Sequence, residues 1–278
     1  MKVLTSVVNN PTFIEIQYHT LRKYLKGAAY EFIVFNDAKN FPDPSNEGDL
    51  TLRTQISDMC RTLGVQCIEI PNDHHQFLKH RHEDVFNKHI LRYQHEHPDK
   101  YLLLDSDMFL IAELDITKYF SYDCAVLLQS RSELHYIWPG LCYFDMTKIQ
   151  APHLLNWAQG RGGDTGGMMA PWLQAQMAGA VMPSTDDLRW KKDQTFHTTS
   201  VYFIPHLWSC SWDASELPLK DPALLTFLQE DPRNVGGKFF CEIYDNVFLH
   251  YRAGGNWNGE GMDVHKTLAM KLKQVLLA

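Results

Sequence analysis

Four short β-like runs in the first part of the chain predict strands at residues 3–8, 32–35, 66–70 and 101–104, and the last of them is apolar enough to be buried. Between these runs, apolar side chains recur at three- to four-residue spacing, which predicts helices over 13–25, 52–63 and 78–93. Strands that alternate with helices in this way are typical of βαβ crossovers. We therefore expect an α/β protein with a mainly parallel, doubly wound sheet.

The second half of the chain is less regular. Its apolar runs predict strands at 125–129, 141–144, 199–204 and 247–249, with Gly- and Trp-rich loops between them in place of regular helices. Residues 263–277 have the pattern of an amphipathic helix. Because no repeat, low-complexity segment or linker interrupts the chain, we expect one domain over residues 1–278.

Composition and charge narrow the classes of function. The chain has 278 residues, of which 45% are hydrophobic and 21% charged, as in an ordinary soluble globular protein. Its net charge of −7 argues against nucleic acid or an anionic membrane surface as the main partner. No apolar stretch has the length of a membrane span, and the first apolar run stops at Asn9, before the length of a signal peptide. The six cysteines form no CxxC pair, which favours free thiols in a cytoplasmic protein.

Asp105 and Asp107 stand between two apolar segments, since they follow the predicted strand 101–104 and precede the apolar residues 108–111. Two carboxylates in such surroundings repel each other and lose hydration unless a positive charge lies between them. A divalent cation is the candidate, and oxygen ligands suit Mg²⁺ or Mn²⁺. Asp-x-Asp is by itself a common tripeptide, and the pair could instead cap a turn or the start of a helix.

Asn9, Asp37 and the aspartate pair each come at the carboxyl end of a predicted strand. In doubly wound sheets, ligands bind in the crevice at this edge of the sheet. We therefore expect these side chains to share one crevice. His250 also follows an apolar segment and precedes Arg252 and two glycines, which makes it a candidate third ligand, although a lone histidine in such a place is more often structural.

The segment 101–111, in which an apolar strand leads into Asp-Ser-Asp and Met-Phe-Leu-Ile, resembles the DxD segment of GT-A fold glycosyltransferases. TSVVNN and EFIVFNDA are similar to the first two strands at the nucleotide, and WPGLCYFDM (138–146) is similar to the acceptor-side strand. GGDTGGMM resembles the segment beside the sugar. VFLHYRAGGNW (247–257) resembles the C-terminal His loop of retaining enzymes such as glycogenin and the lipopolysaccharide galactosyltransferases. Together these segments cover nearly the whole chain.

The resemblance implies a metal-dependent glycosyltransferase with a GT-A fold, in which residues 1–107 form the nucleotide-binding half and 108–278 the acceptor-side half with the His loop. The donor would be a nucleotide-diphosphate sugar, in particular a UDP-sugar, and the acceptor a carbohydrate or another hydroxyl compound. Mn²⁺ or Mg²⁺ would be held by Asp105, Asp107 and His250. Contacts to the nucleotide and its diphosphate would come from Val8, Asn9, Asp37, Arg81, Ser106, Arg252, Gly254 and Gly255.

The His loop departs from the pattern of these relatives, which carry His-x-x-Gly and a later Lys-Pro-Trp where this chain has Arg252 and Gly-Gly-Asn-Trp at 254–257. The departure leaves the diphosphate contacts open. Upstream, seven of the fourteen histidines lie between 74 and 97, at spacings that place no ligand set on one helix face. We interpret that segment as a solvated helix, with Arg81 as its one site candidate.

Asp164 lies in the glycine-rich stretch 160–169, which is neither a Walker A loop nor a GxGxxG fingerprint. Its glycines permit close approach to a ligand, and a surface loop has the same composition. The resemblance implies that Asp164 stands beside the anomeric carbon, with Asp105 as a second catalytic candidate. In an inverting enzyme Asp164 would be the general base, and in a retaining one it would orient the sugar; the His loop favours retention. The acceptor would bind around Trp138.

Other classes of protein have similar patterns. A phosphatase of the haloacid dehalogenase type also carries DxD after an apolar strand, but on its first strand and with Thr or Val where this chain has Phe109. A nucleotidyltransferase would need a Gly-rich basic loop in place of Asn9-Asn10-Pro11. A third alternative is a non-catalytic module that binds the nucleotide sugar and the metal without turnover.

Overall fold

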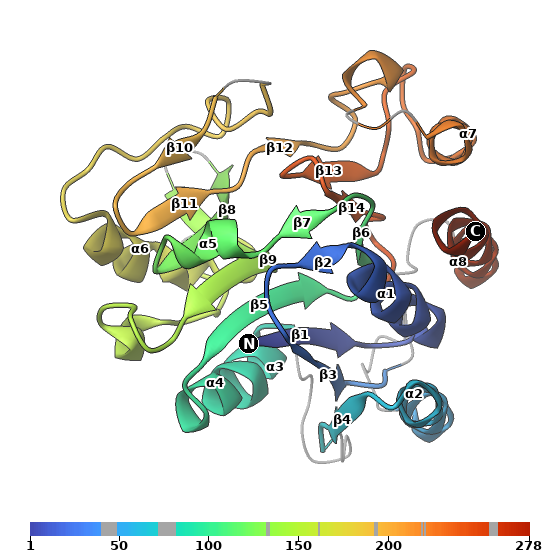
Figure 1. Cartoon of the computed structure of the whole chain (residues 1–278), viewed down its shortest axis with the longest axis horizontal. Helices are drawn as coiled ribbons and strands as arrows, with labels where there is room; N and C mark the ends of the chain where they lie inside the picture. Colours follow the sequence, from blue (N-terminus) through green and yellow to red (C-terminus); the bar gives the residue numbers. More distant parts are fainter. Residues whose placement is uncertain are drawn as a thin grey trace.

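An eight-stranded sheet forms the centre of the computed structural model, with the strand order β10-β11-β8-β9-β5-β1-β3-β4 (Figure 1). The structure describes residues 1–39, 49–71, 82–131, 134–160, 162–191, 194–217, 219, 221–255 and 261–278. Four of the seven neighbouring strand pairs are parallel, and β5, β1, β3 and β4 are parallel in succession. The strands of this sheet are β1 (Lys2–Val7), β3 (Glu31–Asn36), β4 (Gln66–Glu69), β5 (Lys100–Asp105), β8 (Cys124–Arg131), β9 (Leu134–Asp145), β10 (Phe196–His197) and β11 (Val201–Phe203).

Helices lie on both faces of this sheet, with α3, η1 and α6 in one core cluster and α1 and α2 in the other. The described helices are α1 (Pro11–Tyr24), α2 (Leu50–Leu63), α3 (His82–Val85), the π-helix η1 (Phe86–Leu91), α4 (Arg92–Glu96), α5 (Thr117–Phe120), α6 (Ala170–Met177), α7 (Pro222–Gln229) and α8 (Met262–Leu277). Three short 3₁₀ turns complete the helical elements: η2 (Pro152–Leu154), η3 (Gly167–Met169) and η4 (Ala214–Glu216).

The central strands β1, β3 and β5 are buried on both faces, which explains their mainly apolar composition. Successive residues of β5 point to opposite faces: Tyr101 and Leu103 join one core cluster, whereas Leu102 and Leu104 join the other. The first cluster contains side chains of α3, η1 and α6, and the second contains side chains of α1 and α2. The α/β class and the mainly parallel sheet predicted from the sequence are therefore confirmed.

A smaller sheet joins distant parts of the chain. It has the order β12-β13-β14-β6, with β6 (Met108–Leu110), β12 (His206–Leu207), β13 (Glu242–Tyr244) and β14 (Phe248–His250). In its β14–β6 pair, His250 stands opposite Met108, the residue after Asp107. A third, two-stranded sheet pairs β2 (Leu25–Lys26) with β7 (Leu114–Asp115). Outside the sheets, α8 packs against α1 and α7, so that the end of the chain lies beside its first helix (Figure 1).

The prediction that the second half lacks regular helices is wrong, because α6 and α7 are present there. Each spans eight residues, too few for a helical period to stand out, and both begin with a proline in their first turn. The Asp221 carboxylate caps the start of α7 by accepting hydrogen bonds from two backbone amides. The predicted strand 141–144 is the end of the longer β9, and the predicted strand 199–204 is reduced to β11.

Two further expectations concern membrane-spanning helices and the division of the chain into halves. None of the helices in the described part of the chain combines the length and the apolar character that a bilayer crossing requires. The division into a nucleotide-binding half and an acceptor-side half at residue 107 stays a prediction.

Gly64 offers a test of the local chain geometry. It ends α2 in the left-handed conformation at φ 66°, where a side chain is disfavoured although no neighbouring atom would clash with it. We expect Gly64→Ala to lower the free energy of unfolding by about 1 kcal/mol. Gly64→Asn should lose clearly less, because asparagine tolerates this conformation. Urea unfolding followed by circular dichroism measures both, and equal stability of all three proteins would contradict the assignment.

Candidate metal centre and active-site cleft

The two aspartates lie in the turn that leads from the central sheet to the smaller one. β5 ends at Asp105, and the chain turns through Ser106 and Asp107 before β6 begins. Gln17, fully buried on α1, clamps this turn by donating from Nε2 to the carbonyl oxygens of Asp105 (2.7 Å) and Met108 (3.1 Å). Sequence analysis missed Gln17, although a glutamine on the apolar face of an amphipathic helix was a usable signal.

His250 reaches the same turn from the last strand of the smaller sheet. Its Nε2 lies 3.3 Å from Asp107 Oδ1, and its Nδ1 lies 2.8 Å from Oε2 of Glu242. Glu242 stands directly opposite His250 in the β13–β14 pair, and Tyr244 donates its hydroxyl to the same carboxylate oxygen. Nδ1–H is donated to the Glu242 carboxylate, which leaves Nε2 as the ring nitrogen that faces Asp107.

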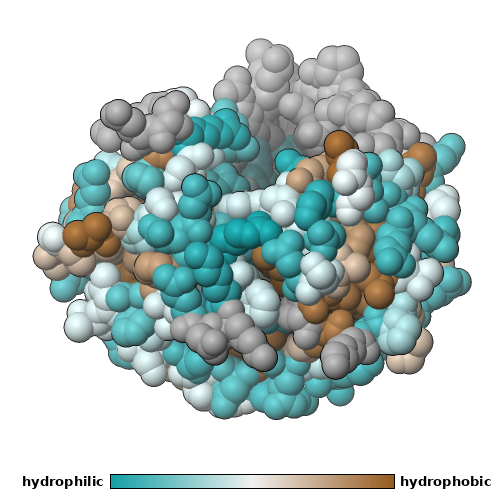
Figure 2. Space-filling model, turned by 90° about the horizontal axis from the view of Figure 1, so that it is seen from above, coloured by the Kyte–Doolittle hydropathy of each residue, from teal (hydrophilic) through white to brown (hydrophobic). Residues whose placement is uncertain are grey.

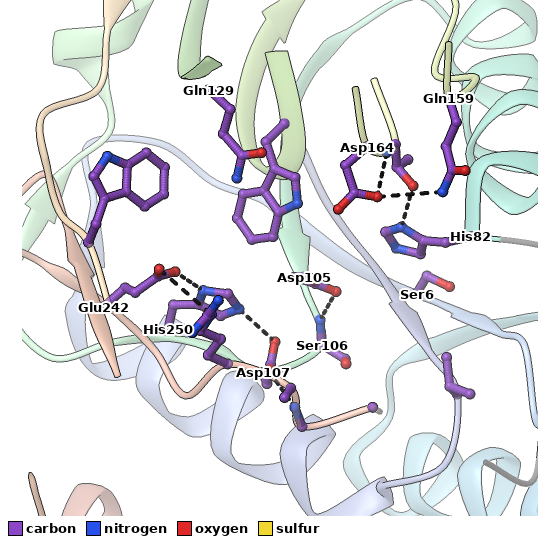
Figure 3. A pocket seen from close by; sticks show the side chains of 18 of the residues that line it. Ser6, His82, Asp105, Ser106, Asp107, Gln129, Gln159, Asp164, Glu242 and His250 are labelled. Atoms are coloured by element: carbon purple, nitrogen blue, oxygen red, sulfur yellow. Dashed lines mark hydrogen bonds and ion pairs between the residues drawn. The ribbon is translucent and has the colours of Figure 1, made fainter. Parts of the chain in front are cut away.

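Asp105, Asp107 and His250 together form a possible metal site. Each offers one ligand atom, and these three atoms lie within 4.8 Å of one another. Figure 3 shows His250 and Asp107 pointing toward each other, with Asp105 and Ser106 beside them on the same turn. Two carboxylate oxygens and an imidazole nitrogen are a donor set that a divalent cation such as Mn²⁺ accepts.

The electrostatics of this cluster require a positive charge. Burial and the neighbouring carboxylate of Asp107 raise the pKa of Asp105 above its ordinary value. Burial alone would also raise the pKa of Asp107, but His250 and the Gly254 amide lower it. Burial opposes the charge on His250 too, yet Asp107 and Glu242 outweigh it and raise the pKa of His250 to about 10. Two buried carboxylates, those of Asp107 and Glu242, thus contact one imidazole, with the half-buried Asp105 beside them, and a divalent cation would balance this negative charge.

The loop that follows β14 closes over the aspartates. The Gly254 amide donates to Asp107 Oδ2 at 2.7 Å, and Asn9 Nδ2 donates to the Gly255 carbonyl at 3.1 Å. Arg252 lines the cleft, and its guanidinium donates to Ser209 Oγ at 2.7 Å and lies 3.8 Å from Glu242. The loop therefore places the Arg252 guanidinium and two glycine backbones next to the candidate metal ligands.

A cleft of about 1120 Å³ opens above this cluster. A hollow bordered mainly by hydrophilic side chains is visible on the face drawn in Figure 2. The prediction that Asn9 shares this cleft is wrong, because Asn9 lies behind the His loop and donates to the Gly255 carbonyl, which lines the cleft in its place. Arg81 lies outside the described residues. Ten of the residues singled out from the sequence line the cleft: Val8, Asp37, Asp105, Ser106, Asp107, Asp164, His250, Arg252, Gly254 and Gly255.

At the end of β3, Asp37 and Lys39 form an ion pair that also lines the cleft. Lys39 Nζ lies 2.7 Å from Asp37 Oδ2, and both side chains are about 2% exposed. Ser6 and Val8 at the end of β1 line the same region. Lys39 was not predicted, because a lysine in a loop gives no sign in the sequence that it is buried.

Asp164 lies on the wall of the cleft opposite His250, beside His82 and Gln159 (Figure 3). Its side chain is 47% exposed and lies 3.3 Å from Arg131 Nη2. Its Oδ1 accepts from the Thr165 amide at 2.8 Å, and Thr165 Oγ1 lies 3.4 Å from His82 Nδ1. The carboxylate is thus accessible and held by a cation. Its predicted role at the sugar stays a prediction.

Two half-buried tryptophans form an aromatic wall next to the metal ligands. The rings of Trp138 and His250 are 5.1 Å apart, and those of Trp138 and Trp208 lie 6.2 and 5.8 Å from the ring of Tyr244. A Cβ on Gly140 would come within 1.9 Å of the Trp138 ring, so only glycine there leaves room for this orientation of the indole. Both indoles line the cleft.

Solved glycosyltransferases are similar to this chain in structure. The galactosyltransferase LgtC in complex with donor and acceptor sugar analogues is 15% identical, with a TM-score of 0.36 over 66% of this chain and 67% of LgtC. A structure of LgtC with an active-site mutation is 14% identical, with a TM-score of 0.36 over 66% of each chain. The mannosyltransferase PcManGT from Pyrobaculum calidifontis, in complex with GDP-Man and Mn²⁺, is 13% identical, with a TM-score of 0.43 over 73% of this chain and 55% of PcManGT.

The chain thus spans about two thirds of the length of LgtC and 55% of that of the mannosyltransferase. No protein-family model matches the sequence, and no curated protein is significantly similar to it. Because all three TM-scores are below 0.5, we base the functional proposal on the geometry of the site.

The two glycines of the His loop allow a matched test of the metal centre. A Cβ on Gly254 would lie 2.8 Å from Asp107 Oδ2 and 2.5 Å from a ring carbon of Phe13, whereas a Cβ on Gly255 would meet nothing within 4 Å. We expect Gly254→Ala to displace the loop and weaken Mn²⁺ binding about tenfold or more. Gly255→Ala is the control and should bind Mn²⁺ like the wild type. Titration of free Mn²⁺ by electron paramagnetic resonance measures both, and equal affinities would argue against the metal centre.

Proposed function

We propose that the protein is a GT-A type glycosyltransferase that moves a sugar from a nucleotide-diphosphate donor to an acceptor hydroxyl, with Mn²⁺ or Mg²⁺ held by Asp105, Asp107 and His250. The observation that supports it most is the convergence of these three side chains, from two distant segments, at the floor of a cleft of about 1120 Å³. Because imidazole is a softer ligand than a carboxylate, the set favours Mn²⁺ over Mg²⁺.

The chemistry of such a transfer depends on the leaving diphosphate. A divalent cation bound at the three ligands would neutralise the negative charge that develops on it. Arg252 would add donors from the same side, and the Gly255 amide, next to the metal ligands, is a further candidate donor. The side chains that fix His250 and Asp107, namely Glu242 and Gln17, would preorganise the ligands so that little rearrangement is needed during the reaction.

The base of the nucleotide would lie at the other end of the cleft, near Val8 and the Asp37–Lys39 pair. A carboxylate beside an ammonium matches a base edge that carries an N–H next to a carbonyl oxygen. Uracil has this edge, which supports a UDP-sugar, and guanine shares it. Adenine and cytosine present the reverse order of donor and acceptor on their pairing edges.

The sugar and its acceptor would occupy the middle of the cleft. Asp164 on one wall would orient the donor sugar in a retaining reaction, and Asp105 would contact the sugar or the ribose from the floor. Trp138 and Trp208 on the other wall offer flat apolar surfaces to an acceptor sugar ring.

A phosphatase of the haloacid dehalogenase type, or a module without turnover, would share the metal ligands. Release of UDP from a UDP-sugar only when an acceptor sugar is added separates transfer from both.

Asp107 is the ligand whose loss should matter most, because it contacts both His250 and the Gly254 amide. We expect Asp107→Ala to abolish the Mn²⁺-dependent rise in melting temperature that UDP produces in the wild type. Asp213→Ala is the control, because it removes a partly exposed ion pair with Lys238 and the cap of η4, both away from the cleft lining. The melting temperatures of both variants are measured by thermal shift with UDP, GDP, ADP and CDP, with and without Mn²⁺. Undiminished Mn²⁺-dependent stabilisation of Asp107→Ala by UDP would refute the metal assignment.

The base end of the cleft is tested separately. The double variant Asp37→Asn/Lys39→Gln removes both charges together, so that neither is left buried alone. We expect its affinity for UDP at saturating Mn²⁺ to fall about tenfold, which corresponds to the loss of a hydrogen bond to a charged group. Its preference for UDP over CDP should shrink, while its Mn²⁺ affinity stays unchanged. Isothermal titration measures all three quantities, and unchanged UDP and CDP affinities would place the base elsewhere.

A further inference from the structure

A buried arginine lies beneath the loop that follows β14. Arg233 comes shortly after α7, and it forms an ion pair with Asp231 in which the two side chains are 1% and 0% exposed. The pair is bidentate, with Nε donating to Asp231 Oδ1 at 2.9 Å and Nη2 donating to Oδ2 at 2.7 Å. The planar fork of the guanidinium is therefore fixed in orientation by its partner.

The remaining donors of Arg233 bind the backbone of the His loop. Nη1 donates to the carbonyl oxygen of Arg252 at 2.8 Å, and Nη2 donates to that of Tyr251 at 3.2 Å. The guanidinium also stacks between the rings of Tyr251 (4.0 Å) and Phe240 (4.6 Å). One side chain thus binds two successive carbonyl groups directly after His250.

These two carbonyls need a partner because of the local backbone. Arg252 and Ala253 both have positive φ, at 66° and 58°, a conformation that side chains other than glycine disfavour. Here the chain leaves the β14 ladder and turns back, and the Gly254 amide then meets Asp107 Oδ2. Carbonyl groups without partners would make this turn unfavourable; Arg233 donates to both of them, and the Cys241 thiol is a second donor to the Tyr251 carbonyl at 3.6 Å.

Arg233 is also linked to Asp107 through the backbone of Tyr251, which makes one hydrogen bond to each of them. Tyr251 donates its amide to the Asp107 carbonyl at 2.9 Å, and its own carbonyl accepts from Arg233. Arg233 itself is not among the residues that line the cleft, and its charge is balanced by Asp231. Any effect it has on the site must therefore pass through the geometry of residues 251–254.

We propose that Arg233 is a positioning residue for the metal centre, which holds the turn at Arg252 and Ala253 so that Gly254 stays on Asp107 and the Arg252 side chain stays in the cleft. The inference rests on the proposed metal site. Lysine cannot replace Arg233 in this role, because its single ammonium cannot serve a bidentate carboxylate and two carbonyls in one plane.

The test compares Arg233→Lys with a matched control. Arg189 elsewhere in the fold also binds a carboxylate, that of Glu216, and donates to a backbone carbonyl, that of Ser211, at 3.1 Å. Arg189→Lys therefore removes the same kind of contacts without touching the His loop. Mn²⁺ binding to each full-length protein is titrated by electron paramagnetic resonance, and the melting temperature without metal is recorded alongside.

We expect Arg233→Lys to bind Mn²⁺ at least tenfold more weakly than the wild type, while Arg189→Lys stays within about twofold. A purely structural role would lower the melting temperature of both variants and leave the Mn²⁺ affinity of Arg233→Lys intact, and that result overturns the inference. If Arg233→Lys does not fold, Asp231→Asn decides, because it loosens the guanidinium without removing it. Mn²⁺ binding by Asp231→Asn should then weaken by more than threefold, and wild-type affinity overturns the inference.

The two proposals fail in different ways. A wild-type protein that binds no Mn²⁺ refutes the metal site and with it the proposed function. A wild-type protein that binds Mn²⁺, together with an Arg233→Lys variant that binds it equally well, leaves the proposed function standing and refutes only the role of Arg233.

Discussion

The repulsion between Asp105 and Asp107 is the constraint around which the rest of the site is arranged. Both carboxylates lie at the end of a strand in the middle of the sheet, Asp107 buried and Asp105 half-buried at the cleft, and Glu242 adds a further buried negative charge close by. The fold meets this charge with the imidazole of His250 and with the backbone amide of Gly254. A divalent cation would satisfy the same demand, which is why the ligand set fits metal-dependent chemistry.

Holding this arrangement requires contacts between parts of the chain that are far apart in the sequence. The Gly254–Asp107 bond joins residues 147 positions apart, and it exists because β14 pairs with β6 directly after the aspartate turn. Gln17 on α1 holds the turn from one side, and Arg233 holds the returning loop from the other. The C-terminal helix contributes as well, since His265 on α8 lies 3.0 Å from the hydroxyl of Tyr251. The site thus depends on the smaller sheet and on the docking of both ends of the chain.

The cleft above the site changes in chemical character along its length. A buried ion pair lies at the end of β3, the acidic cluster with Arg252 lies at the floor, and tryptophans form one wall. The protein carries a net charge of −7, so an anionic nucleotide would depend on the local positive charge of Lys39, Arg131 and Arg252, which line the cleft, and on a bound cation. This separation of charge would direct a nucleotide sugar into one orientation, with its diphosphate at the aspartates and its sugar toward Asp164.

The sequence by itself determined the elements whose signal is local. The strands β1, β3 and β5 are mainly apolar because both of their faces are buried, and the aspartate pair is visible because two carboxylates stand between two apolar runs. Glu242, Lys39 and Arg233 carry no such local signal, and the position of Gln17 on the apolar face of its helix indicates burial but not what it binds. Their roles depend on the register of β13 with β14, on which face of α1 meets the aspartate turn, and on the depth at which two loop cations are buried. These are properties of long-range packing, in which residues far apart in the sequence compete for the same buried hydrogen bonds, and only the tertiary structure decides which of them meet.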